Sequence, residues 1–400
     1  MTLLAISTRF ILFISSAGVV QGIGLASLLY FHPQSDKSVT KFLSLHIITI
    51  SILMFAGLSE YLFSWQTLIL HLSFQFLIGP FLYLYVRSFK ERITWRKAWP
   101  HLVLFLVILI SAIQTYISWI KRYPSIGKMP REALLDPYTY IRVAMRNVQT
   151  IIYYFLARKE LRSYQRSIQH LYSETSRINL NWVKWLLNGF LLIIIMLIIV
   201  AVLIFIYPDQ FNLMVLIVAA ILTPYIYLVT FKGIGQPTIW QGVPGGDRGK
   251  IEKEMDQAER IRSARTNKID PDAGVKGLPQ AKSSEIASQI ILLMEKEKLF
   301  EKPELTLQML ADKLGIPSYQ TSQAINDGLK RNFFELVNGY RVEEAKRLLV
   351  DPKNDNYTIL SVGFEAGFNS KTTFHTVFKK FTGVTPTEFK QQNKGIPAEV

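Results

Sequence analysis

The sequence contains no cysteine, which excludes disulfide bonds, thiolate metal sites and a cysteine nucleophile. Its six histidines are scattered, and no two stand at metal-ligand spacing on one predicted helix. The Gly-rich ATP lid that a histidine kinase needs is missing, as are a carboxylate pair and a nucleophile–base set. The sequence therefore indicates neither an enzyme nor a cofactor or metal site.

Charged residues are also scarce. They make up 19% of the chain, below the usual quarter, while hydrophobic residues make up 50%. Residues 1–282 contain 30 Lys and Arg against 15 Asp and Glu, whereas residues 283–400 contain 15 of each kind. The net charge of +15 thus belongs to the apolar part of the chain, where membrane loops explain it more simply than nucleic-acid binding does.

Residues 1–282 contain long apolar stretches. A helix needs roughly 20 residues to cross the hydrocarbon core of a bilayer, and seven stretches are long enough. They cover residues 10–31, 42–63, 68–89, 98–119, 138–156, 182–207 and 211–231. The sixth includes "LLIIIMLIIVAVLIFI", which has no polar side-chain atom. The fifth is the weakest because it carries Arg142, Arg146, Asn147 and Gln149, and an interfacial helix is the alternative for it.

The distribution of Lys and Arg predicts the topology, because these residues favour cytoplasmic loops. Seven spans with the amino terminus outside place 12 of them in inner loops and 5 in outer segments. Six spans with the amino terminus inside give 12 against 7. Both arrangements keep the carboxyl-terminal part in the cytoplasm, and seven spans give the better contrast. The start "MTLLAISTRF" lacks a basic n-region, so we expect the first span to be retained.

Polar side chains within the spans are candidate ligand contacts, because burying them in lipid is costly. We single out Arg142, Arg146, His71 and Gln75. The two arginines lie one turn apart on one helical face and would suit an anionic ligand. The alternative is that they extend toward the membrane interface. Pro80 and Pro224 stand inside spans, where proline kinks a helix.

The chain divides into three regions by composition. Residues 1–232 form the multipass membrane domain, residues 233–282 a cytoplasmic linker, and residues 283–400 a helical domain. The linker is rich in Gly and Pro, but at 250–265 apolar residues recur at steps of three and four. This pattern predicts a short amphipathic helix that could pair with a second copy, or else serve as a charged spacer.

The last region carries two helix-turn-helix patterns. In the first, Thr306 caps a helix that faces inward with Met309, Leu310 and Leu314. Gly315 makes the turn and a second helix runs from about 318 to 328. A longer helix follows, with a capping box at Asn332 and Glu335.

The pattern then repeats. Thr358 caps one helix, Gly367 makes the turn, and Ser370 caps "KTTFHTVFKKF". On this last helix Phe374, Val377, Phe378 and Phe381 are expected to face inward. A final helix has a capping box from Thr385 to Glu388, with Pro386 at its first position.

The stretch "FNSKTTFHTVFKKFTGVTPTEFK" resembles the signature of the AraC/XylS family of bacterial transcription regulators. "NFFELVNGYRVEEAKRLL" is similar to that family's linker helix between its two helix-turn-helix units. The match covers about residues 305–390. The membrane half resembles a variant of the family in which a multipass domain replaces the soluble sensor. Two positions depart from the family: Thr321 stands where Leu is usual, and Gly363 where Ala is usual. Gly363 costs about 1 kcal/mol of helix propensity.

The resemblance implies that the second helix of each unit enters a major groove. The expected base contacts are Tyr319, Gln320 and Gln323 in the first unit and Lys371, Thr372, His375 and Thr376 in the second. Backbone contacts are expected from Ser370, Lys379 and Lys380, and from the amide end of the helix after Thr385.

Taken together, the sequence predicts an all-α protein with a seven-helix transmembrane bundle and a cytoplasmic tandem helix-turn-helix domain. We expect a transcription regulator in a bacterial inner membrane. Its expected partners are promoter DNA, the lipid bilayer, RNA polymerase, a second copy of the chain and an unknown signal ligand. The alternative is a membrane receptor or transporter whose helical tail binds a protein.

Overall fold

The computed structural model describes residues 3–33, 35–62, 65–123, 130, 132, 136–175, 178, 180–207, 210–234 and 278–393. These residues form helices and turns, and no strand longer than a single bridge occurs among them. The predicted all-α class is therefore confirmed. The amphipathic helix predicted at 250–265 lies outside the described residues. The chain divides into an amino-terminal unit, Met1–Arg162 with Leu180–Arg248, and a carboxyl-terminal unit, Ser163–Asn179 with Gly249–Val400.

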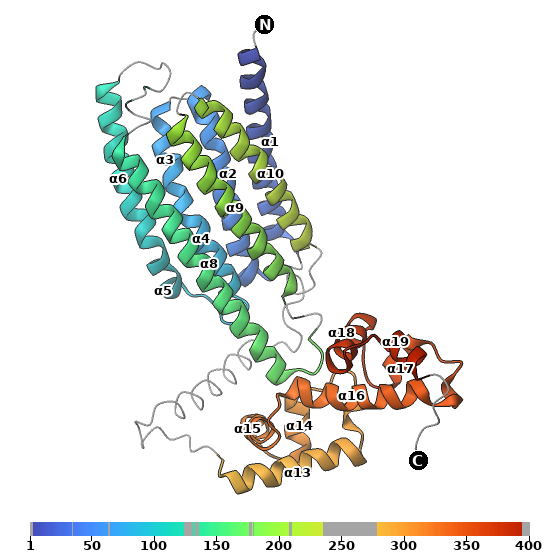
Figure 1. The fold of residues 1–400 in the computed structure, drawn as a ribbon. Helices are drawn as coiled ribbons and strands as arrows, with labels where there is room; N and C mark the ends of the chain where they lie inside the picture. Colours follow the sequence, from blue (N-terminus) through green and yellow to red (C-terminus); the bar gives the residue numbers. More distant parts are fainter. Residues whose placement is uncertain are drawn as a thin grey trace. The chain divides into compact units, whose positions relative to one another are not determined.

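Among the described residues, seven helical segments occupy the seven predicted stretches and run side by side as a bundle (Figure 1). They are α1 (Leu3–Phe31), α2 (Lys37–Leu62), α3 to α4 with their flanking 3-10 turns (Trp65–Arg87), α5 to α6 (Trp95–Arg122), α8 (Pro137–Leu171), α9 (Asn181–Ile206) and α10 (Phe211–Ile234). The fifth continues beyond Arg162 into the carboxyl-terminal unit. By length and composition, five of the described helices can cross a membrane: the second, third, fourth, sixth and seventh of these segments.

The third segment is broken at its middle, as the proline within it predicts. The 3-10 turn Phe74–Leu77 separates α3 (Leu68–Ser73) from α4 (Ile78–Arg87). Pro80 has no N–H to donate to the carbonyl of residue 76. That carbonyl accepts a hydrogen bond from the Gln149 side chain at 3.2 Å instead. A polar residue of the weakest predicted span thus satisfies the backbone where the proline leaves it open. Pro224, by contrast, lies inside α10 without interrupting it.

The carboxyl-terminal unit contains α13 (Gln280–Lys296), α14 (Leu307–Leu314), α15 (Ser318–Gly328), α16 (Phe333–Val350), α17 (Ile359–Glu365), α18 (Lys371–Thr382) and α19 (Pro386–Gln392). The predicted caps are confirmed. Thr306, Thr358 and Ser370 each accept a backbone N–H three residues on, and capping boxes form at Asn332 and Thr385. Figure 1 shows α16 as the long helix shared by the two helix-turn-helix pairs α14–α15 and α17–α18.

The core of the second pair is built on aromatic rings. Phe368, Phe374 and Phe378 are fully buried, and the Phe374 ring packs against the other two. A Cβ at Gly363 would lie 2.5 Å from the Phe374 ring. Gly363 is therefore more than a weak helix former, since it makes room for the central ring of this core. Met309 and Phe381 were predicted to face inward, and this is wrong, because their side chains are 41% and 39% exposed.

A segment that the sequence did not single out also belongs to this unit. Residues 172–175 follow the end of α8 and are here called the strap segment. They contact the residues before α14, the helix α16 and the first turn of α18. Ser173 donates its hydroxyl to the Leu305 carbonyl at 2.6 Å, and its own carbonyl accepts from the Asn338 side chain at 2.8 Å. Glu174 accepts a hydrogen bond from the Thr373 hydroxyl at 3.0 Å. The strap segment thus connects α16 with the residues just before α14 and with the first turn of α18.

Candidate functional site

The second helix of the second helix-turn-helix pair, α18, begins at a tight turn. Gly367 has φ +90°, a left-handed conformation that glycine adopts without strain. A Cβ there would also lie 2.5 Å from the Phe300 carbonyl oxygen. Ser370 then caps α18 by accepting the Thr373 N–H at 3.1 Å. The turn and cap together hold the amino-terminal end of α18 in a defined direction.

The polar face of α18 is open to solvent. Lys371, Thr372, Thr376 and Lys379 are exposed and His375 is half-buried. None of the ion pairs found among the described residues involves Lys371 or Lys379. The expected base-contacting residues of this unit therefore share one exposed face with an unpaired cation at each end.

Two expected backbone contacts have partners within the protein. Lys380 lies 3.8 Å from the Glu335 carboxylate and over the Phe334 ring. The Ser370 hydroxyl accepts from Thr373 and also donates to its hydroxyl at 2.8 Å. Lys380 can still turn toward a phosphate, since a surface ion pair is weak.

The amino end of α19 differs more from the prediction. Its first turn already holds an anion, because the Glu388 carboxylate accepts the Thr385 N–H at 2.7 Å. This backbone hydrogen bond lowers the pKa of Glu388. A phosphate approaching these amides would meet a carboxylate, so the expected contact at this helix end is disfavoured.

The second helix of the first pair, α15, presents fewer polar groups to solvent. Tyr319 and Gln320 are half-buried, and the Gln320 amide donates to the Tyr319 hydroxyl at 3.0 Å. Gln323 differs from its predicted role: it is 6% exposed and its amide pairs with both backbone groups of Leu278. Leu278 precedes α13, and nothing in the local spacing of α15 announces that partner. Thr321, the other unusual position, is fully buried.

The polar residues predicted in the bundle are only partly brought together. Arg146 donates to the side chains of Gln75 and of Asn147, the latter at 2.6 Å. Arg142 donates to Ser111 at 3.1 Å and to Thr115 at 2.6 Å. Both arginines and Gln75 line adjoining cavities. His71 packs against the Phe55 ring instead and is absent from the linings of these cavities.

One family model and one curated relative match this chain. Residues 310–392 match a family model described as a helix-turn-helix domain. A stretch of 92 residues is 30% identical to an "Uncharacterized HTH-type transcriptional regulator in cgkA 5'region" from Pseudoalteromonas carrageenovora. That alignment covers 22% of this chain and 50% of the relative, so the chain spans about half the length of the curated relative it matches. No solved structure matches the chain.

Proposed function

We propose that this chain, whose residues 310–392 match a helix-turn-helix domain, is a membrane-embedded transcription regulator of the AraC type. The amino-terminal bundle senses a signal, and α15 and α18 bind promoter DNA on the cytoplasmic side. The observation that carries the proposal is the exposed face of α18. It combines two unpaired lysines with hydroxyl and imidazole groups on a capped helix that follows a helix-turn-helix turn.

The chemistry of that face suits a DNA groove. In helix-turn-helix proteins the amino-terminal residues of the second helix meet base edges. Threonine and histidine supply donors and acceptors for bases, while Lys371 and Lys379 supply charge for phosphates. Lys371, Thr372 and His375 lie in the first turns of α18. We therefore assign base contacts to Lys371, Thr372, His375 and Thr376, and phosphate contacts to Lys379.

A link between sensing and DNA binding is supported by the course of α8. This helix is continuous from Pro137 to Leu171 and carries both Arg142 and Arg146. The strap segment follows it directly and bonds to Asn338 and Thr373. A change in α8 would thus reach the helix that joins the two helix-turn-helix pairs and the first turn of α18.

Binding of the full-length chain in lipid nanodiscs to a pool of random duplexes tests the proposal. We expect enrichment of a motif with two blocks about one helical turn apart, since each recognition helix would occupy its own major groove. Affinity should fall as salt rises, because bound lysines release counterions from DNA. An unenriched pool with salt-independent binding would favour a receptor or transporter with a protein-binding tail.

The topology has its own test. We expect a reporter that is active only in the periplasm to stay silent when fused after the last residue of the full chain. A cytoplasmic reporter at the same place should be active. The reverse pattern would contradict the placement of the helix-turn-helix domain beside the chromosome.

A further inference from the structure

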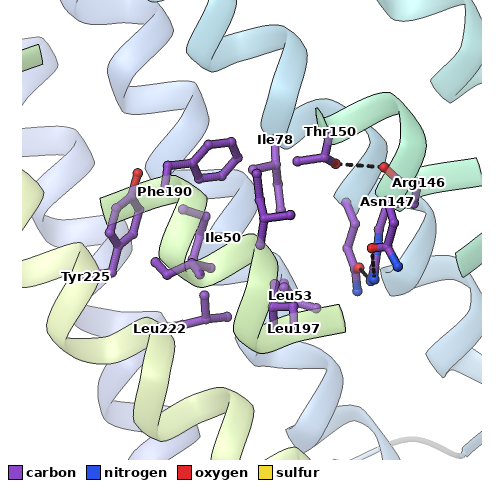
Figure 2. Close-up of a pocket in the computed structure, with 13 residues that line it drawn as sticks. Ile50, Leu53, Ile78, Arg146, Asn147, Thr150, Phe190, Leu197, Leu222 and Tyr225 are labelled. Carbon is purple, nitrogen blue, oxygen red and sulfur yellow. Dashed lines mark hydrogen bonds between the residues drawn. The ribbon is translucent and has the colours of Figure 1, made fainter. Parts of the chain in front are cut away.

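Three adjoining cavities lie inside the bundle, and they share one polar wall. The largest has a volume of about 170 Å³ and the other two about 30 and 20 Å³. Gln75 and Arg146 line all three. Figure 2 shows the 30 Å³ cavity, with Arg146 and Asn147 at one end, Tyr225 at the other and apolar side chains such as Ile50 and Leu222 between them.

The largest cavity is apolar over most of its wall. Side chains from α1, α2, α3, α6, α8, α9 and α10 line it, among them Met54, Leu72, Trp119, Val143, Leu197 and Val218. An apolar cavity of about 150 Å³ is large enough to admit benzene. This cavity therefore has room for one aromatic ring or a short acyl chain, and a whole phospholipid would be too large for it.

Two buried polar atoms in this wall have no hydrogen-bond partner. They are the Ser15 hydroxyl and the Tyr140 hydroxyl. Ser15 is fully buried. Leaving a buried polar group unpaired costs about 1–3 kcal/mol. A ligand with an acceptor near these hydroxyls would recover that free energy.

Neither Arg142 nor Arg146 has an anion among its described hydrogen-bond partners. A guanidinium has five N–H donors, yet Arg142 uses only its Nη2 group, for two hydroxyls, and its buried Nη1 has no partner. Arg146 donates to amide oxygens of Gln75 and Asn147. Asp136 is the acidic residue whose charge acts on Arg142, but its carboxylate accepts hydrogen bonds from Thr139 and forms none with Arg142. Among the described residues, no carboxylate forms an ion pair with either arginine.

The smallest cavity lies between these two cations. Arg142 and Arg146 both line it, and it shares Ile69, Leu72 and Val143 with the largest cavity. Its volume of about 20 Å³ is that of a space for one water-sized group. One oxygen of a carboxylate fits such a space, and it can accept a charge-assisted hydrogen bond from the unpartnered Nη1 of Arg142.

We propose that the bundle binds a small organic carboxylate with one apolar ring or short chain. The carboxylate lies between Arg142 and Arg146, and the apolar body fills the 170 Å³ cavity beside Trp119 and Leu197. The unpartnered hydroxyls of Tyr140 and Ser15 favour a ligand whose ring or chain also carries a hydrogen-bond acceptor. This inference deepens the sensing role in the proposed function by naming the chemical class of the signal.

Direct binding to the full-length chain in zwitterionic nanodiscs tests this site without DNA. The probe is 3-phenylpropionate, measured by titration calorimetry. We expect it to bind at least tenfold more tightly than 3-phenylpropanamide, which lacks the charge, and than acetate, which lacks the ring. Arg146→Gln and Arg142→Gln should each weaken the probe at least tenfold. Arg122→Gln, at the exposed end of α6, is the matched control and should bind like the wild type.

A second variant separates the body of the site from its charge. Ala201→Phe places a ring in the largest cavity and leaves both arginines unchanged, so it too should weaken the probe at least tenfold. Equal binding of the acid and its amide would overturn the proposal, as would undiminished binding by Arg146→Gln. Loss of probe binding in discs that contain anionic phospholipid would overturn it as well, since a lipid headgroup would then be the true occupant.

Failure of the carboxylate site and failure of the proposed regulator function give different results. A probe that binds through both arginines but leaves DNA affinity unchanged keeps the site and contradicts the sensing role. A chain that binds no DNA contradicts the regulator, while the titration of the carboxylate still decides the site.

Discussion

Each unit of this protein holds arginine away from solvent, and the two units satisfy its N–H donors to different extents. In the carboxyl-terminal unit, Arg341 donates to the carbonyls of Phe300 at 2.8 Å and Lys302 at 2.7 Å, and to Pro303 and Asn338. The Phe368 ring covers one face, and Glu174 acts as a nearby opposite charge. In the bundle, the described acceptors of Arg142 and Arg146 are neutral as well, but the buried Nη1 of Arg142 has no acceptor.

This difference separates a structural cation from a candidate binding cation. Burial lowers the pKa of Arg341 to about 10, so the group stays charged at neutral pH, and Glu174 acts in the opposite direction. Every nitrogen of Arg341 has an acceptor within its own unit. A ligand could add little there. The incomplete set of acceptors around Arg142 leaves a place for one.

The largest effect is expected from removing the saturated arginine. Arg341→Ala should lower the free energy of unfolding of the carboxyl-terminal unit by about 3 kcal/mol or more, because several buried carbonyls lose their donor. Hydrogen exchange of α16 amides in the full chain measures this. Arg347→Ala is the control on the same helix. It removes an exposed pair with Glu344 and should change the free energy by about 0.5 kcal/mol. Unchanged protection in Arg341→Ala would mean that this network is not what holds the unit.

The next largest effect concerns a cation that is exposed and unpaired. Lys371→Ala should weaken specific DNA binding about tenfold, or about 1.4 kcal/mol, and reduce the salt slope of the affinity by about one. The folded unit should remain as protected from hydrogen exchange as before. Lys346→Ala, whose side chain pairs with Glu343 on α16, is the control and should leave the slope unchanged. A large loss of protection in Lys371→Ala would show that this residue supports the fold rather than the interface.

Alanine substitutions at two glycines of the carboxyl-terminal unit should have smaller effects on the free energy of unfolding. The two effects should have opposite signs, because only one glycine is closely packed. Gly363→Ala puts a methyl group 2.5 Å from Phe374, and overpacking costs about 1–3 kcal/mol. After the gain of about 1 kcal/mol in helix propensity, a net loss of about 1 kcal/mol is expected. Gly339→Ala in α16 has its nearest neighbour at 3.6 Å and should stabilise the unit by about 0.5–1 kcal/mol. Thermal unfolding followed by hydrogen exchange compares the two, and a gain from both would show that the Phe374 ring moves aside freely.

How much the sequence predicts depends on the range of the interaction. The caps at Thr306, Asn332, Thr358, Ser370 and Thr385 were predicted because each bond spans three residues. The helical segments of the bundle were predicted because length and hydropathy are local too. The exposed face of α18 followed from a period of 3.6 residues.

Interactions between distant residues were missed. Gln323 stands where the resemblance expects a base contact, yet its partner Leu278 is 45 residues away. The strap segment bonds to residues more than 130 positions later. Gly363 looked like a weak point by propensity alone, since the ring that needs its space lies on the next helix. Periodicity and capping carry no information about such partners.

The smallest effect on stability is expected for an arginine inside the bundle, where burying a charge costs the most free energy. Arg146→Gln should change the free energy of unfolding of the bundle by no more than about 0.5 kcal/mol, or raise it. A cation held among neutral acceptors in an apolar surrounding carries a desolvation cost, and glutamine can still pair with Gln75 and Asn147. Thermal unfolding in nanodiscs without added ligand, followed by fluorescence of the buried Trp65–Trp119 pair, measures this. A loss above about 2 kcal/mol would place Arg146 beside Arg341 as a structural cation and remove the contrast between the two units. A retained fold together with a lost carboxylate response would show that the bundle keeps this charge for its ligand rather than for its stability.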